Sequence, residues 1–314
     1  MEVPVYLFTG FMDSGKTTLI RQTLVDEDFG AGAKTLLIAC EDGEVEYDEN
    51  ELLKANTKLV MIEQEDDFNE ITLKRLDDTY HPDQVFIEYN GTWEVATILE
   101  MKLPKNWTLV QSLATVDATT FEVYLNNMRT MIMEQLFAAD VVIFNRCDDN
   151  TPKGKFRRAV KAKNRKAQIA YERADGTVDD GEMEELPYDI TQDIIEITDM
   201  DYGIWYLDAL DDPKKYEGKK VRFLALVYRP EGKLKKGVFI PGRFAMTCCA
   251  ADITFVGFKC KYDRASEIPH RSWITITAEM KTEFALEYKG KGPVLYAIDW
   301  QPAEKPEEEL VYFN

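Results

Sequence analysis

The first half of the chain alternates short apolar runs with segments in which apolar residues recur every three or four positions. Several of the runs are continuous in Val, Ile, Leu and Phe, which is typical of strands covered on both faces. Strands are predicted at residues 3–8, 34–40, 58–62, 83–91, 108–117 and 139–148, and helices at 17–25, 69–80 and 120–139. Strands interleaved with helices favour right-handed crossovers and an α/β domain with a mainly parallel sheet.

The pattern changes from about residue 190 onwards. Residues 219–233, 237–262, 271–293 and 294–300 are rich in β-branched and aromatic residues and are broken by Pro-Glu-Gly and Gly-Lys-Gly turns. This predicts an all-β domain of about five or six strands, most simply a small closed barrel of the OB kind. We therefore expect two domains, 1–190 and 191–314. The predicted junction is 184–203, and a short helix at 202–212 precedes the barrel.

Composition fits two folded domains and narrows the partners. The chain has 314 residues with 45% hydrophobic content, enough for a core in each domain. No stretch approaches 18 consecutive apolar residues, and the first residues are strand-like, so we expect a cytoplasmic protein without direct membrane insertion. The 57 acidic and 38 basic residues give a net charge of −19, which argues against nucleic acid as a partner.

The stretch FTGFMDSGKTTLIRQ, residues 8–22, lies between the first predicted strand and the first predicted helix. It satisfies G-x-x-x-x-G-K-S/T, the phosphate loop whose backbone N–H groups wrap an anion at a helix N-terminus. In this interpretation Lys16 reaches the β- and γ-phosphates and the Thr17 hydroxyl binds Mg²⁺. A Gly-rich turn with an exposed lysine is the alternative. The residues expected to contact the nucleotide here are Gly10, Asp13, Ser14, Gly15, Lys16, Thr17 and Thr18.

A second candidate element is the segment VFIEYNG, which ends a predicted strand with Glu88 and then Gly91. A parallel sheet delivers the carboxyl ends of its strands to the edge where the phosphate loop lies. Glu88 can there hold Mg²⁺ through water or orient the attacking water, and the Gly91 N–H can reach the γ-phosphate. A glutamate at a strand end can also be an ordinary surface charge.

The segment VVIFNRCDD ends another predicted strand and departs by one residue from N-K-x-D, the guanine-reading element of GTPases. The Asp148 carboxylate can accept paired hydrogen bonds from guanine that adenine cannot offer. Asn145 would steady the loop, and the stem of Arg146 would cover the base. These residues favour GTP and GDP over adenine nucleotides, and an ATPase is the weaker alternative.

Taken together, these motifs resemble the CobW-type GTPases, a P-loop family associated with metal delivery and metal homeostasis. GFMDSGKTTLI resembles G-F-L-G-A-G-K-T-T-L, VFIEYNGTWE resembles I-E-T-T-G-L-A-E, TVDATTFE resembles V-V-D-A-x-x-F, and EQLFAADVVIFNRCD resembles E-Q-I-x-x-A-D-x-x-x-x-N-K-x-D. LLIACEDGEVEYDENEL resembles the switch segment V-N-E-F-G-E-x-x-I-D and matches it at Glu41, Gly43, Glu44 and Asp48. The resemblance covers about residues 3–175.

The resemblance implies a GTPase whose switch segment, from Glu41 to Asp48, is ordered by GTP and released by hydrolysis. We expect Lys16, Glu88 and Glu41 to be catalytic. We expect Thr17, Glu88 and Glu41 to bind Mg²⁺.

One departure from the family pattern concerns the cargo metal. The family carries C-x-C-C shortly after the switch segment, but the corresponding stretch VMIEQEDDFNEI has no cysteine. Its carboxylates, Glu63, Glu65, Asp66 and Asp67, are hard oxygen ligands that would not reproduce the selectivity of thiolates for Zn²⁺. We interpret this stretch as an ordinary acidic loop.

Thiols return in RFAMTCCAADITFVGFKCKY, which resembles the C-terminal domain of YcgQ-type bacterial proteins and nearly repeats their R-F-x-x-x-C-C-x-A-D motif. That resemblance spans about residues 193–313. Cys248 and Asp252 lie on one side of a regular strand, and Cys260 can return from the next one. Cys249 faces the opposite side of such a strand and can join them only if a bulge or turn intervenes. With that condition Cys248, Cys249, Asp252 and Cys260 are a candidate Zn²⁺ site, and buried structural cysteines are the alternative.

Two functional hypotheses follow from the sequence. The first is a slow, Mg²⁺-dependent GTPase that couples its nucleotide state to the handling of a transition metal, zinc first, or of a client protein. The second is a nucleotide-gated binding module with little turnover, which docks through its β domain on a permease or another protein.

Overall fold

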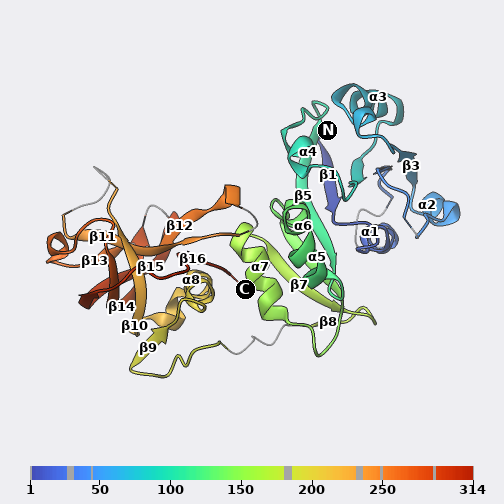
Figure 1. Ribbon diagram of the computed structural model, residues 1–314. Coiled ribbons are helices and arrows are strands. Elements are labelled where there is room, and N and C mark those ends of the chain that lie inside the picture. Colours follow the sequence, from blue (N-terminus) through green and yellow to red (C-terminus); the bar gives the residue numbers. More distant parts are fainter. Residues whose placement is uncertain are drawn as a thin grey trace. The chain divides into compact units, whose positions relative to one another are not determined.

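The computed structural model describes residues 2–26, 32–43, 45–179, 186–230, 236–247, 250–285 and 288–313. The chain divides into two compact units (Figure 1). The first unit comprises Met1–Lys153 and Lys163–Glu182, and the second comprises Gly154–Ala162 and Met183–Asn314. Glu44, Cys248 and Cys249, which the sequence analysis singled out, lie outside the described residues.

The first unit is built on an eight-stranded sheet with the order β3-β2-β4-β1-β5-β6-β7-β8. Neighbouring strands are parallel except for β8, which is antiparallel to β7. The mainly parallel α/β sheet expected from the apolar runs is thus confirmed. The strands are β1 Val3–Thr9, β2 Thr35–Ala39, β3 Thr57–Met61, β4 Gln84–Glu88, β5 Trp107–Asp117, β6 Val141–Cys147, β7 Gln168–Arg173 and β8 Val178–Asp179.

Helices connect these strands. They are α1 Lys16–Val25, α2 Glu49–Lys54, α3 Glu70–Tyr80, α4 Val95–Glu100, α5 Phe121–Asn127, α6 Arg129–Leu136 and α7 Lys153–Lys163. The single helix predicted at 120–139 is wrong, because the backbone leaves helical geometry at Met128, with φ −135° and ψ 37°. The helices α2, α4 and α7 were not predicted. Most of α7 belongs to the second unit.

Both faces of the central strands are covered by apolar side chains. Every residue of β2 and of β4 is buried. Val5 and Leu7 of β1 belong to one apolar cluster, whereas Phe8 belongs to another that contains Ile20 of α1. Successive strand residues face opposite sides of a sheet, so these two clusters cover its two faces. The carboxyl ends of β1, β4, β5 and β6 meet at one edge, as parallel pairing requires.

The second unit is built on a sheet with the order β12-β11-β13-β15-β14-β10-β9, and β16 pairs with β11. Its strands are β9 Ile194–Ile197, β10 Lys220–Tyr228, β11 Val238–Ala245, β12 Thr254–Gly257, β13 Cys260–Lys261, β14 Trp273–Ala285, β15 Gly290–Pro302 and β16 Leu310–Val311. An additional pairing between β10 and β11 closes a circuit of five strands, β10-β14-β15-β13-β11. A sheet-rich domain is therefore confirmed, and its assignment to the OB kind stays a prediction.

The core of the second unit gathers around α8, Tyr202–Asp211, which falls where the sequence predicted a short helix. Trp205 of α8 is fully buried, and its ring centroid lies 4.8 Å from that of Phe223 and 5.3 Å from that of Phe258. The predicted junction contains β9, which pairs in parallel with β10 and so belongs to the second sheet. Within the described ranges, no helix has the length and apolar character needed to cross a membrane.

Candidate functional site

The loop between β1 and α1 has the backbone of a phosphate loop. Gly10 and Gly15 have φ values of +128° and +98°, which glycine adopts without strain. A side chain at Gly10 would also collide with the loop's neighbours, because a Cβ there would lie 2.3 Å from the carbonyl oxygen of Thr115. The Ser14 N–H closes the loop on the Phe11 carbonyl at 3.1 Å. The predicted strand-loop-helix context is thus present at these residues.

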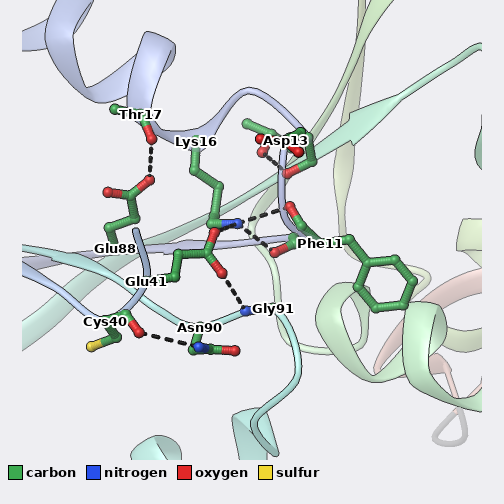
Figure 2. Close-up of polar contacts among 12 residues, drawn as sticks. Phe11, Asp13, Lys16, Thr17, Cys40, Glu41, Glu88, Asn90 and Gly91 are labelled. Atoms are coloured by element: carbon green, nitrogen blue, oxygen red, sulfur yellow. Dashed lines mark hydrogen bonds and ion pairs between the residues drawn. The ribbon is translucent and has the colours of Figure 1, made fainter. Parts of the chain in front are cut away.

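Lys16 folds back over this loop (Figure 2). Its Nζ donates to the carbonyl oxygens of Gly10 at 2.7 Å and Phe11 at 2.8 Å, and it forms an ion pair with Glu41. The side chains of Lys16 and Glu41 are only 2% and 6% exposed. The ammonium group is therefore held at the mouth of the loop and neutralised by a carboxylate from the switch segment.

Glu88, the last residue of β4, is bound through both carboxylate oxygens. Thr17 Oγ1 donates to Glu88 Oε1 at 2.5 Å, and the Tyr47 hydroxyl donates to Glu88 Oε2 at 2.6 Å. Glu88 is 1% exposed, and its burial raises the pKa of the carboxyl group. The hydrogen bonds from Thr17 and Tyr47, and the charge of Lys16, oppose that rise. Burial and the adjacent Glu88 carboxylate raise the pKa of Tyr47, which keeps its hydroxyl protonated and able to donate.

The loop after β4 lies directly against the phosphate loop. A Cβ on Gly91 would lie 2.5 Å from the Gly10 carbonyl oxygen and 2.7 Å from Phe11 Cα, so only glycine fits. The Gly91 N–H donates to Glu41 Oε2 at 3.1 Å (Figure 2). We expect Lys16 Nζ and the Gly91 N–H to contact the terminal phosphates. Glu41 contacts both of these groups.

A cavity of about 290 Å³ adjoins the N-terminus of α1. Asn145 Nδ2 donates to the Ser14 carbonyl at 2.7 Å, while Asn145 Oδ1 is buried and has no hydrogen-bond partner in the described part of the chain. Arg146 Nη1 donates to the Asp13 carbonyl at 3.1 Å and to Asp117 Oδ2 at 2.5 Å. The residues that line the cavity are Gly15, Thr18, Leu19, Gln22, Thr115, Ile143, Asn145, Arg146, Glu172, Arg173, Ala174, Asp175 and Gly176.

Asp148 does not line this cavity, although the sequence assigns it to base recognition. Its Oδ1 atom accepts from the Asn150 N–H at 2.9 Å and from Thr151 Oγ1 at 3.2 Å, which closes the turn after β6. Base reading by Asp148 therefore stays a prediction that requires the carboxylate to exchange these contacts for the base.

Gln135 of α6 is a buried contact of the loop that sequence reasoning missed. Its Oε1 accepts from the Gly10 N–H at 3.2 Å, its carbonyl accepts from Thr9 Oγ1 at 2.8 Å, and its Nε2 donates to the Trp93 carbonyl at 3.1 Å. Ser14 Oγ likewise bonds Thr115 Oγ1 at 2.8 Å. The only available signal for Gln135 was its place in the EQLFAAD segment. Tyr47 had no signal beyond its place in the switch segment.

The zinc candidate of the second unit is not assembled from the described residues. β11 ends at Ala245, and Asp252 lies in a 3-10 turn, Ala250–Asp252, so the regular strand expected through this segment is wrong. Asp252 Oδ1 accepts from the Thr247 N–H at 3.1 Å. Cys260 is fully buried in β13, and burial raises the pKa of its thiol. Across the described ranges, no group of three or more His, Cys, Asp or Glu side chains could hold a metal ion.

The chemistry at the sheet edge fits Mg²⁺ and a nucleotide. Thr17, Glu88 and Glu41 offer one hydroxyl and two carboxylates, which are the hard oxygen ligands that Mg²⁺ prefers. A buried carboxylate with a raised pKa is stabilised in its charged form by a nearby cation. The glycine loop, Lys16 and the N-terminus of α1 provide donors and positive charge for phosphate.

Comparisons with known proteins agree with both resemblances. The family model described as the CobW/HypB/UreG nucleotide-binding domain matches residues 4–171, and the DUF1980 C-terminal domain matches residues 174–313. The UPF0703 protein YcgQ of Bacillus subtilis (strain 168) is 25% identical over 118 residues, which cover 38% of this chain and 41% of YcgQ. The chain thus spans about two-fifths of the length of that curated relative.

Two solved structures match part of this chain. The Zn(II)-bound YjiA GTPase from E. coli is 24% identical with a TM-score of 0.43, and the match covers 59% of this chain and 60% of YjiA. The hydrogenase maturation factor HypB from Archaeoglobus fulgidus is 17% identical with a TM-score of 0.38, and the match covers 55% and 82% of the two chains.

Proposed function

Because the chain belongs to the CobW/HypB/UreG family through its nucleotide-binding domain, we propose that it is a Mg²⁺-dependent GTPase that binds GTP and GDP at the phosphate loop. One observation carries the proposal. Lys16 and Thr17 of the loop are bonded directly to Glu41 and Glu88, which come from the ends of two other strands, beside a cavity lined by Asn145.

The proposal gives each of these groups a role. Bound Mg²⁺ would neutralise charge on the phosphate oxygens, and Thr17, Glu88 and Glu41 would hold it. Lys16 would leave Glu41 for the β- and γ-phosphates. The Gly91 N–H would then donate to the γ-phosphate, and Glu88 would orient the attacking water. Since Glu41 contacts both Lys16 and Gly91, nucleotide binding would shift the switch segment that carries it.

We propose that the cavity selects guanine. Arg146 is hydrogen-bonded to the loop and to Asp117, which would hold its stem over a base. The buried acceptor Asn145 Oδ1 would gain a partner when the cavity is filled. We propose that Asp148 reads guanine after leaving Asn150 and Thr151.

The test is competition between unlabelled GTP and ATP against mant-GTP, with Mg²⁺, for the wild type and Asp148→Ala. We expect GTP to compete at least tenfold better than ATP in the wild type and the preference to fall towards unity in the variant. Phosphate release would report turnover. Absence of mant-GTP binding by the wild type would rule out the proposed function.

We further propose that the nucleotide state is coupled to a transition metal, with zinc as the first to test, or to a client protein. The second unit would be the cargo or client domain, and its five-strand pairing circuit supports an OB-type barrel. The adjacent thiols at positions 248 and 249 are the motivation for zinc.

The nucleotide-gated binding module is the second candidate. It is favoured by the contacts of Glu41 with Lys16 and with the Gly91 N–H. A bound nucleotide would have to displace this carboxylate, which would slow the change to a state that hydrolyses GTP. Its partner would be a permease or another protein. Tight GTP binding without phosphate release, unchanged by added Zn²⁺, would support this candidate over the GTPase.

A further inference from the structure

The hydroxyl of Tyr47 contacts the carboxylate expected to serve the metal. Glu88 uses one oxygen for Thr17 and the other for Tyr47, so it lies between the phosphate loop and the switch segment. With Glu88 itself 1% exposed, water has little access to replace the Tyr47 hydrogen bond. The orientation of this carboxylate therefore depends on Tyr47.

The direction in which the Tyr47 hydroxyl points is fixed by its surroundings. Its ring is half-buried and packs against the apolar cluster that contains Phe8 and Ile20. The next residue, Asp48, caps α2 by accepting from the N–H groups of Asn50 and Glu51 at 2.9 and 3.0 Å. Packing on one side and a helix cap on the other leave the phenol few alternative positions.

The segment that carries Tyr47 is also tied to the helix of the phosphate loop. Arg21 of α1 donates from Nε and Nη2 to Glu51 Oε2 at 3.0 and 2.8 Å, and from Nη1 to the Glu46 carbonyl at 3.4 Å. The position of Tyr47 relative to Thr17 is thus set by contacts to α1 as well as by Glu88. A shift of the switch segment would change the hydrogen bond to Glu88.

The ring and the hydroxyl of Tyr47 make separate contributions. The ring packs against apolar side chains, and another apolar residue such as isoleucine could supply that packing. Only the hydroxyl can donate the hydrogen bond to Glu88.

We propose that Tyr47 is a positioning residue for Mg²⁺, which it serves by orienting Glu88 from the switch segment; this inference rests on the proposed function. Hydrogen bonds from groups behind a metal ligand orient the ligand, and their loss costs about 10- to 100-fold in metal affinity. The Mg²⁺ requirement for nucleotide binding should therefore depend on the Tyr47 hydroxyl.

The experiment is a Mg²⁺ titration of mant-GTP binding by the full chain, compared with binding in EDTA. For Tyr47→Phe we expect the Mg²⁺ concentration at half-maximal binding to rise about tenfold, while the affinity in EDTA changes less than twofold. Tyr47→Ile, which also lacks the hydroxyl group, should show a rise of the same size. An unchanged midpoint in Tyr47→Phe would overturn the inference, and so would an equal loss of affinity with and without Mg²⁺.

Tyr171→Phe is the matched control. Its hydroxyl also makes a partly buried hydrogen bond, to the Lys153 carbonyl at 2.7 Å, but three strands separate β7 from β4. Its Mg²⁺ midpoint should equal that of the wild type, and a shift as large as that of Tyr47→Phe would overturn the inference. A wild type that binds no mant-GTP at saturating Mg²⁺ would overturn the proposed function itself, and this inference with it.

Discussion

Glu41 places a negative charge where we expect phosphate oxygens to bind. Its two oxygens contact Lys16 Nζ and the Gly91 N–H, and its side chain is almost fully buried. A triphosphate must displace this carboxylate before it can use either group. In the nucleotide-free protein Glu41 thus competes with the ligand, whatever it contributes afterwards to Mg²⁺.

We predict that Glu41→Gln binds nucleotide more tightly in the absence of Mg²⁺. The amide no longer neutralises Lys16, which keeps its bonds to the Gly10 and Phe11 carbonyls. The expected gain is about 1 kcal/mol, or roughly fivefold in the Kd of mant-GDP in EDTA. GTP hydrolysis with Mg²⁺ should fall, because a proposed Mg²⁺ ligand has been weakened.

Glu46→Gln is the matched control, since it removes one charge from an exposed residue of the same segment. Its affinity should stay within a factor of two of the wild type. If Glu41→Gln instead bound nucleotide more weakly in EDTA, competition between Glu41 and phosphate would be the wrong account.

Glu88 predicts a pH dependence of stability. Burial raises its pKa in the folded state above the ordinary 4.5. Below pH 4.5 the folded and unfolded states both hold the proton. As pH rises from 4.5 through the folded pKa, the unfolded state releases its proton first, so the free energy of unfolding falls by at most about 1.4 kcal/mol per pH unit.

Glu88→Gln lacks this titration. The stability of the variant relative to the wild type should therefore increase between pH 5 and pH 8 in the absence of nucleotide and Mg²⁺. Hydrogen–deuterium exchange of peptides covering β1 and β4, compared between the two proteins at each pH, measures the difference. A difference that does not change with pH would mean that burial does not govern this carboxylate.

The residues of the site differ in how well the sequence alone predicts them. Gly10, Lys16 and Thr17 are predicted by a local motif, in which consecutive backbone N–H groups wrap one anion. Tyr47 and Gln135 act through bonds to residues 41 and 125 positions away, and no local spacing encodes such contacts. The proposed base reading by Asp148 would require this side chain to leave Asn150 and Thr151, which a motif does not specify.

At the scale of elements, the site depends on how closely two loops approach each other. The loop after β4 contacts the phosphate loop at Gly91, where a Cβ would lie 2.5 Å from a backbone oxygen. We predict that Gly91→Ala pushes the loops apart. It should cost about 1–3 kcal/mol of stability and reduce mant-GTP affinity at least tenfold, measured by thermal unfolding and titration.

Gly43→Ala is the control for stability, because a Cβ there meets only Asp13 Oδ1, at 3.8 Å, and its φ is not positive. Its unfolding temperature should match that of the wild type. Wild-type affinity in Gly91→Ala would show that the close approach of these loops is not needed for binding.

Sequence periodicity found the elements that bury apolar runs and missed those held by other contacts. The strands β1 to β6 of the first sheet were predicted because each contains a run of apolar residues. The strand β7 carries mixed side chains and is held by pairing with β6. The strand β9 is mostly apolar but only four residues long, and it is held by pairing with β10. The break at Met128 interrupts a segment whose apolar periodicity continues through it, so the pattern alone predicted one helix.

At the scale of the whole molecule, the net charge of −19 would repel a triphosphate, so we expect the proposed binding to depend on the local cation Lys16 and on backbone N–H groups. In the second unit the strand pattern predicted a sheet domain. The β10–β11 pairing joins strands that are consecutive in the chain, with Tyr228 opposite Ile240. The β13–β15 pairing in the same circuit joins Cys260 to Leu295, and local patterns do not predict it. Local patterns likewise do not predict a metal site that is assembled from separate loops.

The cysteines of the second unit differ in their chemistry. The thiolate is the form that binds metal, and burial of Cys260, which pairs with Phe239 and Leu295 in the core, raises its pKa. We therefore expect Cys260→Ala to cost about 1–2 kcal/mol of stability but to leave the zinc content of the purified full chain unchanged. Cys248→Ser and Cys249→Ser should each lower it. Elemental analysis with and without GTP measures the metal, and equal zinc in all variants would remove the cargo role proposed for this unit.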